Sequence, residues 1–251
     1  MYFESHAHFD DKRFKEDREE LLGLLPSCGI EYVVNVGCDV KSSKQSIRLA
    51  EQYDYIYAAV GIHPHELYDI SSQTIEELRR LSQHKKVVAI GEIGLDYYYD
   101  THPRELQQFW FRQQLRLAES VNKPVIIHSR DAAQETFDIM SASGVRRGVI
   151  HCYSGSAPMA VDYAQMGFYI GIGGVVTFPN GKKMVEVVDA LPLEKILIET
   201  DSPYLSPAPN RGKRNDSRNL EFIVNKIAEI KKIAPEKVAE ITGKNAQSLF
   251  F

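Results

Sequence analysis

Two hydrophobic patterns alternate along the chain. Short apolar runs rich in β-branched residues predict buried strands, and apolar residues at helical spacing among charged ones predict amphipathic helices. The expected strands begin with a run at 2–4 that leads to His6 and His8, and continue at 30–36, 55–62, 86–92, 124–128, 148–151, 168–172 and 196–201. The expected helices cover 11–27, 42–53, 72–83, 103–121, 132–143, 159–166, 182–190, 220–234 and 235–250.

This alternation divides the 251 residues into eight strand–helix units of about 31 residues, the repeat expected of a closed (β/α)8 barrel. Strands that are apolar almost throughout are typical of a parallel sheet buried on both faces. We therefore predict an α/β fold, a (β/α)8 TIM barrel that forms a single domain over residues 1–251. An open, doubly wound sheet is the alternative, and it fits eight evenly spaced units less well.

The composition narrows the class of protein. An apolar content of 43% and a charged content of 25% are ordinary for a globular protein, and a net charge of −4 argues against broad electrostatic coating of nucleic acid. A local basic patch beside an active site remains compatible with that charge. Three cysteines without CxxC spacing, together with the lack of a signal-peptide pattern or a membrane-spanning apolar run, favour a soluble cytoplasmic protein.

Histidines and acids gather at the ends of the predicted strands. His6 and His8 are two residues apart, so in a strand their side chains point to the same face. Alone, such a pair is more often two polar residues at a strand exit than a metal site. The same residue types recur, however, at the ends of later strands, where a barrel carries its catalytic groups: His63, His65, Glu92, His128, His151 and Asp201.

This concentration of imidazoles and carboxylates predicts a metal site, because clustered groups of this kind repel one another or stay unsatisfied without a cation. Six ligands are too many for one tetrahedral ion, so we expect two divalent ions, with Glu92 placed to bridge them. Imidazole with carboxylate suits Zn, Mn, Co or Fe, and Mg less readily. The expected ligands are His6, His8, Glu92, His128, His151 and Asp201.

The ions give the acids a chemical role. A divalent ion lowers the pKa of water and supplies a nucleophile at neutral pH. Asp201, after the last strand, is the candidate to orient that water and accept its proton, whereas a plain ligand role without proton transfer is the alternative.

Three more polar residues are expected close to the ligands. Pro64 disturbs the strand alternation between His63 and His65, so these two histidines are either loop residues or side chains that surround the ions. Glu199 has the same parity as Asp201 and is expected to face the barrel interior, where it would hold a ligand histidine in position.

Cationic and aromatic residues follow the same strand ends and are candidates for substrate contacts. Arg130, two residues after His128, can form a fork with phosphate oxygens. Arg211, Lys213 and Arg214 form a short basic loop that is either a phosphate contact or a solvated face. Aromatic rings can stack on nucleobases or simply pack on the rim, and those at strand ends are Tyr97, Tyr98, Tyr99 and Tyr204.

Six short motifs, in order along nearly the whole chain, resemble the TatD-type metal-dependent deoxyribonucleases of the amidohydrolase superfamily. They are His6-Ala7-His8, Gly61-Ile62-His63-Pro64-His65, Gly91-Glu92-Ile93-Gly94-Leu95-Asp96-Tyr97, His128-Ser129-Arg130, His151-Cys152-Tyr153-Ser154-Gly155 and Glu199-Thr200-Asp201-Ser202-Pro203-Tyr204-Leu205. The resemblance implies the same six metal ligands. It also implies hydrolysis of a phosphodiester, with release of nucleotides from a DNA end. No obligate protein partner is evident from the sequence, which is silent on the oligomeric state.

The chain departs from that family at three places. The family usually has Asp where Glu4 stands, two residues before the first histidine. It commonly has His in place of Asn210 and Glu-Pro in place of Asp216-Ser217. The basic core of this loop is kept, but its contacts with a substrate can differ.

Two other functions remain open from the sequence. One is a small-molecule amidohydrolase or lactonase on the same scaffold. Many such enzymes bridge their metals with a carboxylated lysine, and the matching place here is Glu92, which favours the nuclease-like branch. The other is a metal-stabilised scaffold without turnover, against which the intact set of ligands and Asp201 weigh.

Overall fold

A computed structural model describes residues 1–99 and 101–251. Its eight strands are parallel and follow one another around a single sheet in chain order. Next to the gap between the first and last strands, a parallel bridge joins Ala7 to Ser202, and the His8 N–H donates to the Ser202 carbonyl at 2.8 Å. The predicted TIM barrel is confirmed. Its strands are β1 Tyr2–Ala7, β2 Ile30–Val36, β3 Ile56–Val60, β4 Val87–Asp96, β5 Val125–Arg130, β6 Gly148–Ile150, β7 Tyr169–Ile172 and β8 Ile196–Ile198.

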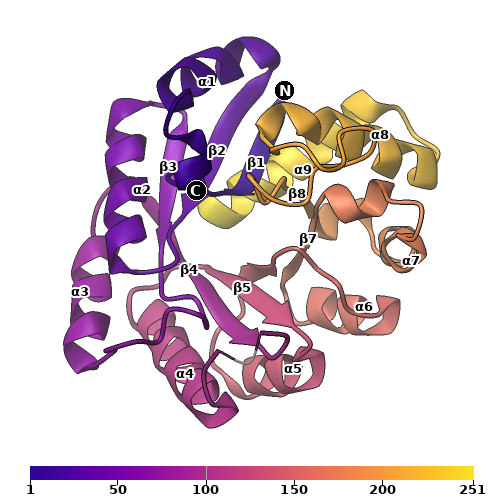
Figure 1. Cartoon of the computed structure of the whole chain (residues 1–251). Coiled ribbons are helices and arrows are strands. Elements are labelled where there is room, and N and C mark those ends of the chain that lie inside the picture. The colour runs from indigo at the N-terminus through magenta and orange to yellow at the C-terminus, as the bar shows by residue number, and fades with distance from the viewer. Residues whose placement is uncertain (100) are drawn as a thin grey trace.

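Helices surround the sheet and alternate with its strands (Figure 1). Local sequence signals set their ends: Asp39, for example, accepts a hydrogen bond from the Ser42 N–H at 2.6 Å and caps the second helix. Among the described residues, no helix is both long and apolar enough to cross a membrane. The helices are α1 Arg18–Leu24, α2 Val40–Gln52, α3 Ser72–Ser82, α4 Arg104–Ser120, α5 Ala133–Ala142, α6 Ala157–Gln165, α7 Lys182–Ala190, α8 Leu220–Lys231 and α9 Pro235–Phe250.

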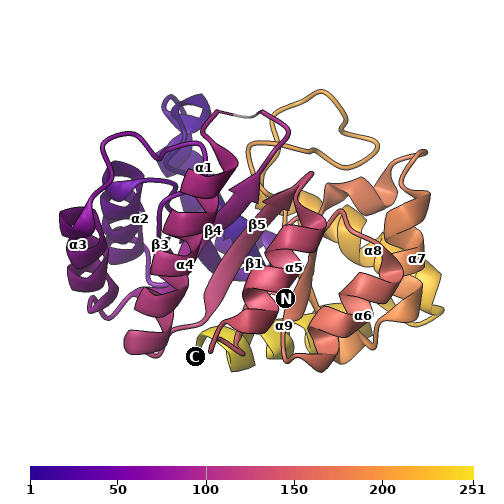
Figure 2. The same ribbon diagram turned by 90° about the horizontal axis from the view of Figure 1, so that it is seen from below.

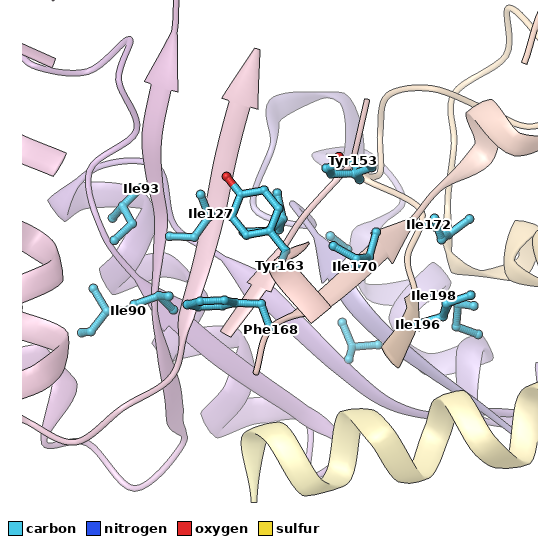
Figure 3. Packing of buried hydrophobic residues seen from close by; sticks show 14 of the residues in the cluster. Ile90, Ile93, Ile127, Tyr153, Tyr163, Phe168, Ile170, Ile172, Ile196 and Ile198 are labelled. Atoms are coloured by element: carbon cyan, nitrogen blue, oxygen red, sulfur yellow. The ribbon is translucent and has the colours of Figure 1, made fainter. Parts of the chain in front are cut away.

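Most of the hydrophobic core lies between the sheet and this ring of helices. Isoleucines on neighbouring strands, such as Ile90 on β4 and Ile127 on β5, are fully buried there. In Figure 3, Tyr163 and Phe168 lie with the strand isoleucines in this layer. The layer fixes the strands against the helices and so holds their carboxyl ends in register.

A second core fills the lower part of the barrel. Phe3 of β1 and Ile126 of β5 belong to it, together with Leu249 and Phe250 of α9. Figure 2 shows α9 crossing beneath the strands, at the end opposite to the arrowheads. The barrel is therefore sealed below, and only its upper end, where the strands terminate, is available for a functional site.

Several element boundaries differ from those expected, among them the following three. The helix expected at 11–27 is divided into the 3-10 turn Lys12–Phe14, α1 and the 3-10 turn Leu25–Cys28, which ends at Gly29 with φ +83°. The strand expected at 86–92 continues to Asp96. The strand expected at 196–201 ends at Ile198, so Asp201 lies in the following loop, where its N–H donates to the His6 carbonyl at 3.0 Å.

Candidate metal centre

One group of donor atoms gathers where β1, β4 and the β8 loop meet. His6 Nε2 and His8 Nε2 are 3.1 Å apart. Glu92 Oε2 lies 3.5 and 3.6 Å from these two nitrogens, and Asp201 Oδ1 lies 3.9 and 3.6 Å from them. His6, His8, Glu92 and Asp201 could therefore hold one ion between them.

A second group lies on the other side of the Glu92 carboxylate. Glu92 Oε1 is 2.8 Å from His128 Nδ1 and 2.7 Å from His151 Nε2, and these two nitrogens are 3.4 Å apart. One oxygen of Glu92 thus faces the first group and the other faces the second. This is the arrangement expected of a bridging carboxylate.

The spacing of these atoms fits metal ligation. Ligands about 2.1 Å from a tetrahedral ion lie about 3.4 Å from one another. The separations in the first group and the 3.4 Å between His128 Nδ1 and His151 Nε2 are close to this value, whereas the contacts of Glu92 at 2.7 and 2.8 Å are of hydrogen-bond length. Imidazole nitrogens at 3.1 and 3.4 Å either share a proton or point their lone pairs at a common cation. A cation satisfies all of them together, so the residues present fit divalent ions.

The electrostatics of Glu92 follow from its burial among histidines. Burial alone would raise the pKa of this carboxyl, but the charge of His151 and hydrogen bonds from His128 and His151 hold the pKa well below its usual range. Burial likewise opposes ionisation of Asp201, and a hydrogen bond from His8 with the charge of His151 keeps the pKa of Asp201 low. Both carboxylates are therefore ionised at neutral pH and available as ligands.

Other contacts orient the ligand histidines. His8 Nδ1 is 2.8 Å from the Val36 carbonyl, and His128 Nε2 is 3.0 Å from Asp96 Oδ2. Each contact uses the ring nitrogen that does not face Glu92, which fixes the tautomer with its lone pair toward the metal centre.

Glu199 lies beneath both groups. The rings of His6 and His151 stack at 3.8 Å between centroids, with an interplanar angle of 12°, and donor atoms of both lie within 4.8 Å of a Glu199 oxygen. His151 Nδ1 is 3.6 Å from Glu199 Oε1. Glu199 is fully buried beside His6 and His151, and its role in holding a ligand histidine stays a prediction.

His63 and His65 also lie at the barrel mouth. The His65 N–H donates to His63 Nδ1 at 3.1 Å, so the proton of a neutral His63 ring is on Nε2, 3.7 Å from Glu92 Oε1. Burial lowers the pKa of His63 well below its usual value and keeps the ring neutral. A nitrogen that carries a proton cannot ligate a metal, so the geometry favours a supporting role for His63.

Asp96 is a site residue that the sequence reasoning left unassigned. Its Oδ2 is 3.0 Å from both His65 Nε2 and His128 Nε2. The signal was present in the sequence: Glu92, Gly94 and Asp96 alternate along one strand. It was missed because the expected strand ended at Glu92.

We expect Asp96→Asn to weaken metal binding and lower the hydrolytic rate by about 10- to 100-fold without unfolding the protein. The single amide oxygen of asparagine cannot accept from the Tyr98 and Tyr99 N–H groups and from His128 at once. Metal titration followed by elemental analysis measures the loss. Asp138→Asn, on the exposed side of α5, is the matched control, and equal metal affinity in the two variants would count against this role of Asp96.

Glu4 and Ser217, which both depart from the family pattern, are in contact in the structure. The carboxylate of Glu4 is fully buried and accepts hydrogen bonds from Thr200 Oγ1 at 2.6 Å and Ser217 Oγ at 2.9 Å. Burial raises the pKa of Glu4 to about 8, against the effect of these bonds. Glu4 and Ser217 therefore act together to hold the loop that carries Asp201. The third departure, Asn210, bonds to Asn219 at 2.9 Å.

The cationic candidates for substrate contacts differ in their exposure and in whether another side chain already pairs with them. Arg130 stands at the end of β5 with its guanidinium carbon 3.9 Å from the Tyr98 ring centroid. Arg211 packs over Phe178 at 3.6 Å, and Lys213 is exposed. Arg214 forms a two-fold ion pair with Asp17, at 2.7 and 2.5 Å, so its charge is already neutralised.

The aromatic candidates Tyr97 and Tyr204 differ in their exposure. Tyr97 is only 7% exposed, and its hydroxyl accepts from Gln108 at 3.0 Å, which makes it a packing residue of the rim. Tyr204 is 41% exposed, lies 6.4 Å from the His8 ring and donates to Asp11 at 3.2 Å. Of these two rings, only Tyr204 presents a surface beside the metal centre.

Comparison with known proteins agrees with this geometry. The sequence model of the TatD related DNases matches residues 3–251. The chain is 42% identical to an uncharacterized metal-dependent hydrolase of Bacillus subtilis, YabD, over all of this chain and 99% of that protein. It is 33% identical to YcfH of Escherichia coli, also called an uncharacterized metal-dependent hydrolase, over 98% of this chain and 94% of that one.

A solved structure carries the same fold. The crystal structure of YjjV, a TatD homologue from Escherichia coli, superposes with a TM-score of 0.94 at 32% identity, and the match covers 99% of this chain and 97% of that one. The family match extends over nearly the whole chain and includes every ligand candidate. The chain therefore belongs to the TatD-related DNase family and is a metal-dependent hydrolase.

Proposed function

We propose that the protein hydrolyses phosphodiester bonds of DNA, from a strand end, with two divalent ions held at the barrel mouth. The observation that supports two ions is the Glu92 carboxylate, whose two oxygens face separate groups of donors. The first ion would be held by His6, His8, Glu92 and Asp201, and the second by His128, His151 and Glu92. Zn, Mn, Co or Fe suits these donors best, and Mg less well.

Bound divalent ions would lower the pKa of water and neutralise charge on the phosphate. Asp201 Oδ1 lies beside His8 Nε2 at 3.6 Å with its side chain 15% exposed, so it faces the opening where a water and a phosphate would meet. In the proposed reaction Asp201 orients the water and accepts its proton. The Nε2–H of His63 and the guanidinium of Arg130 donate hydrogen bonds to phosphate oxygens on the opposite side.

The choice of DNA rests on the family and on the cations above the mouth. Arg211 and Lys213 are exposed, and Arg130 is half-buried with its guanidinium over the Tyr98 ring, whereas Arg214 pairs its charge with Asp17. Tyr204 would pack against a nucleotide near His8, and Tyr97 would serve only as support. The three cysteines are free thiols, which fits our proposal of a cytoplasmic location.

Removal and return of metal tests the proposal. The protein is stripped with a chelator, dialysed and reloaded with Zn, Mn, Co or Mg, and then incubated with end-labelled single- and double-stranded DNA. We expect elemental analysis to find two ions per reloaded chain, and nucleotides to be released from the labelled DNA only by the reloaded protein. Asp201→Asn serves as the catalytic control and should release none.

Two outcomes would overturn the proposal. Turnover of amide or lactone substrates, with no release of nucleotides, would assign the chain to small-molecule hydrolysis. Fewer than one ion per chain after loading would exclude the paired site. Equal DNA cleavage by the native protein and Asp201→Asn would show that a contaminating nuclease acts in the assay.

A further inference from the structure

Two exposed tyrosines follow β4 beside the metal centre and have no role in the reaction as proposed. Tyr98 and Tyr99 are 57% and 60% exposed. Their rings meet edge to face, with centroids 4.9 Å apart and an interplanar angle of 89°. Large aromatic surfaces this exposed cost free energy in water, which makes the pair a candidate contact for an apolar or aromatic group.

A cation packs against both rings. The Arg130 guanidinium carbon lies 3.9 Å from the Tyr98 centroid and 4.9 Å from the Tyr99 centroid. Because Arg130 follows ligand His128 by two residues on β5, this contact joins the tyrosines to the phosphate side of the mouth.

The backbone of the pair is tied to the metal centre itself. The N–H groups of Tyr98 and Tyr99 donate to Asp96 Oδ1 at 3.0 and 3.3 Å, and Asp96 Oδ2 contacts His128 Nε2 at 3.0 Å. The Tyr99 ring also meets the His65 ring edge to face at 5.1 Å. One carboxylate thus holds both His128 and the backbone of the two tyrosines, so their relative position is set before any substrate arrives.

We propose that Tyr98 and Tyr99, here called the tyrosine platform, bind an unpaired nucleobase next to the cleaved phosphate, with one ring stacked on the base and the other in contact with its edge. This inference rests on the proposed function, because it assigns a base-recognition site to the same nuclease. Arg130 would then act on the phosphate and the base of one nucleotide. Its charge would face the phosphate, and its planar guanidinium would pack against the tyrosine ring on which the base stacks. Every base has a π face, so the platform would act on any sequence.

The alternative is that the two rings only pack the rim around Arg130. The two explanations differ in what the substrate must contain. A stacking platform loses its effect when the base is removed from the substrate, whereas a packing role affects all substrates alike. The test therefore changes the protein and the substrate together.

The experiment uses the metal-loaded protein and a single-stranded oligonucleotide, intact or with an abasic residue on either side of the cleaved phosphate. Tyr98→Ala, Tyr99→Ala and the double variant are compared with the wild type. We expect kcat/KM on the intact strand to fall by about 5- to 150-fold in the double variant, the range that corresponds to ~1–3 kcal/mol of stacking per base. On the abasic strand, wild type and double variant should cleave at the same reduced rate.

Conservative and remote changes serve as controls. Tyr98→Phe with Tyr99→Phe keeps both rings and should restore the rate on the intact strand. Phe109→Ala removes an aromatic that is 50% exposed on the outside of α4 and should leave all rates unchanged. Equal rates of the wild type on intact and abasic strands would overturn the platform, as would an equal loss on both strands in the double variant. If the loaded wild type cleaves no DNA at all, the proposed function fails, and the platform fails with it.

Discussion

Glu92→Gln is expected to lower the rate of hydrolysis by about 10²- to 10³-fold, because it would weaken the hold on both proposed ions and so the electrostatic stabilisation that they would supply. The glutamine amide keeps the volume of the side chain but has one oxygen instead of two, so it cannot face both groups of donors. The loss of charge also leaves His128 and His151 without the carboxylate that lies 2.8 and 2.7 Å away. Metal content, measured by elemental analysis on the same preparation as the rate, should fall below two ions per chain.

The matched control makes the same chemical change far from the mouth. Glu76 lies on α3 with its side chain 68% exposed, and Glu76→Gln should keep both the metal and the rate. If Glu92→Gln retains two ions and more than about a tenth of the rate, Glu92 does not bridge, and the paired site would need another anchor.

Gly94→Ala is expected to be the most destabilising single substitution in the barrel. A Cβ at this position would overlap the carbonyl oxygen of His128 on the neighbouring strand, and the residue has φ +149°, which L side chains rarely adopt. Strands β4 and β5 would have to separate. We expect a loss of at least about 4 kcal/mol in the free energy of unfolding, or failure to accumulate as soluble protein.

Gly243→Ala makes the same chemical change but is expected to stabilise the protein. Gly243 lies inside α9, and a Cβ there meets no atom within 4 Å. Alanine in a helix interior is favoured over glycine by roughly 1 kcal/mol, which should raise Tm by about 2–4 °C for a domain of this size. Thermal unfolding followed by circular dichroism compares the two variants. A Gly94→Ala protein that melts within about 3 °C of the wild type would show that the strands can adapt.

Much of the fold and of the metal centre could be predicted from the sequence because barrel periodicity fixes where strands end. Once His6, His8, Glu92, His128, His151 and Asp201 are assigned to strand ends, the parallel sheet brings them together. The structure places them in two groups around Glu92, as that reasoning anticipates. The ligand assignments themselves stay predictions until metal is measured.

The parts that could not be predicted depend on contacts between distant segments. The periodicity of the sequence does not predict that Arg214 pairs with Asp17, nearly 200 positions away. It also does not predict that Tyr97 is buried while Tyr98 and Tyr99 are exposed. The role of Asp96 was missed because we expected the strand to end at Glu92, whereas β4 continues to Asp96. The tautomer of His63 depends on one backbone N–H, which no sequence pattern specifies.

The closure of the lower end of the barrel by α9 determines where a substrate can enter and where a product can leave. Since Leu249 and Phe250 close the lower end against Phe3, the barrel is a dead end and not a tunnel. For the exonuclease proposed above, this means that a polynucleotide cannot be threaded through the barrel, so each excised nucleotide would leave by the same opening that admits the shortened strand. In the proposed reaction, product and substrate would compete for one opening, and we expect a mononucleotide product to act as a competitive inhibitor.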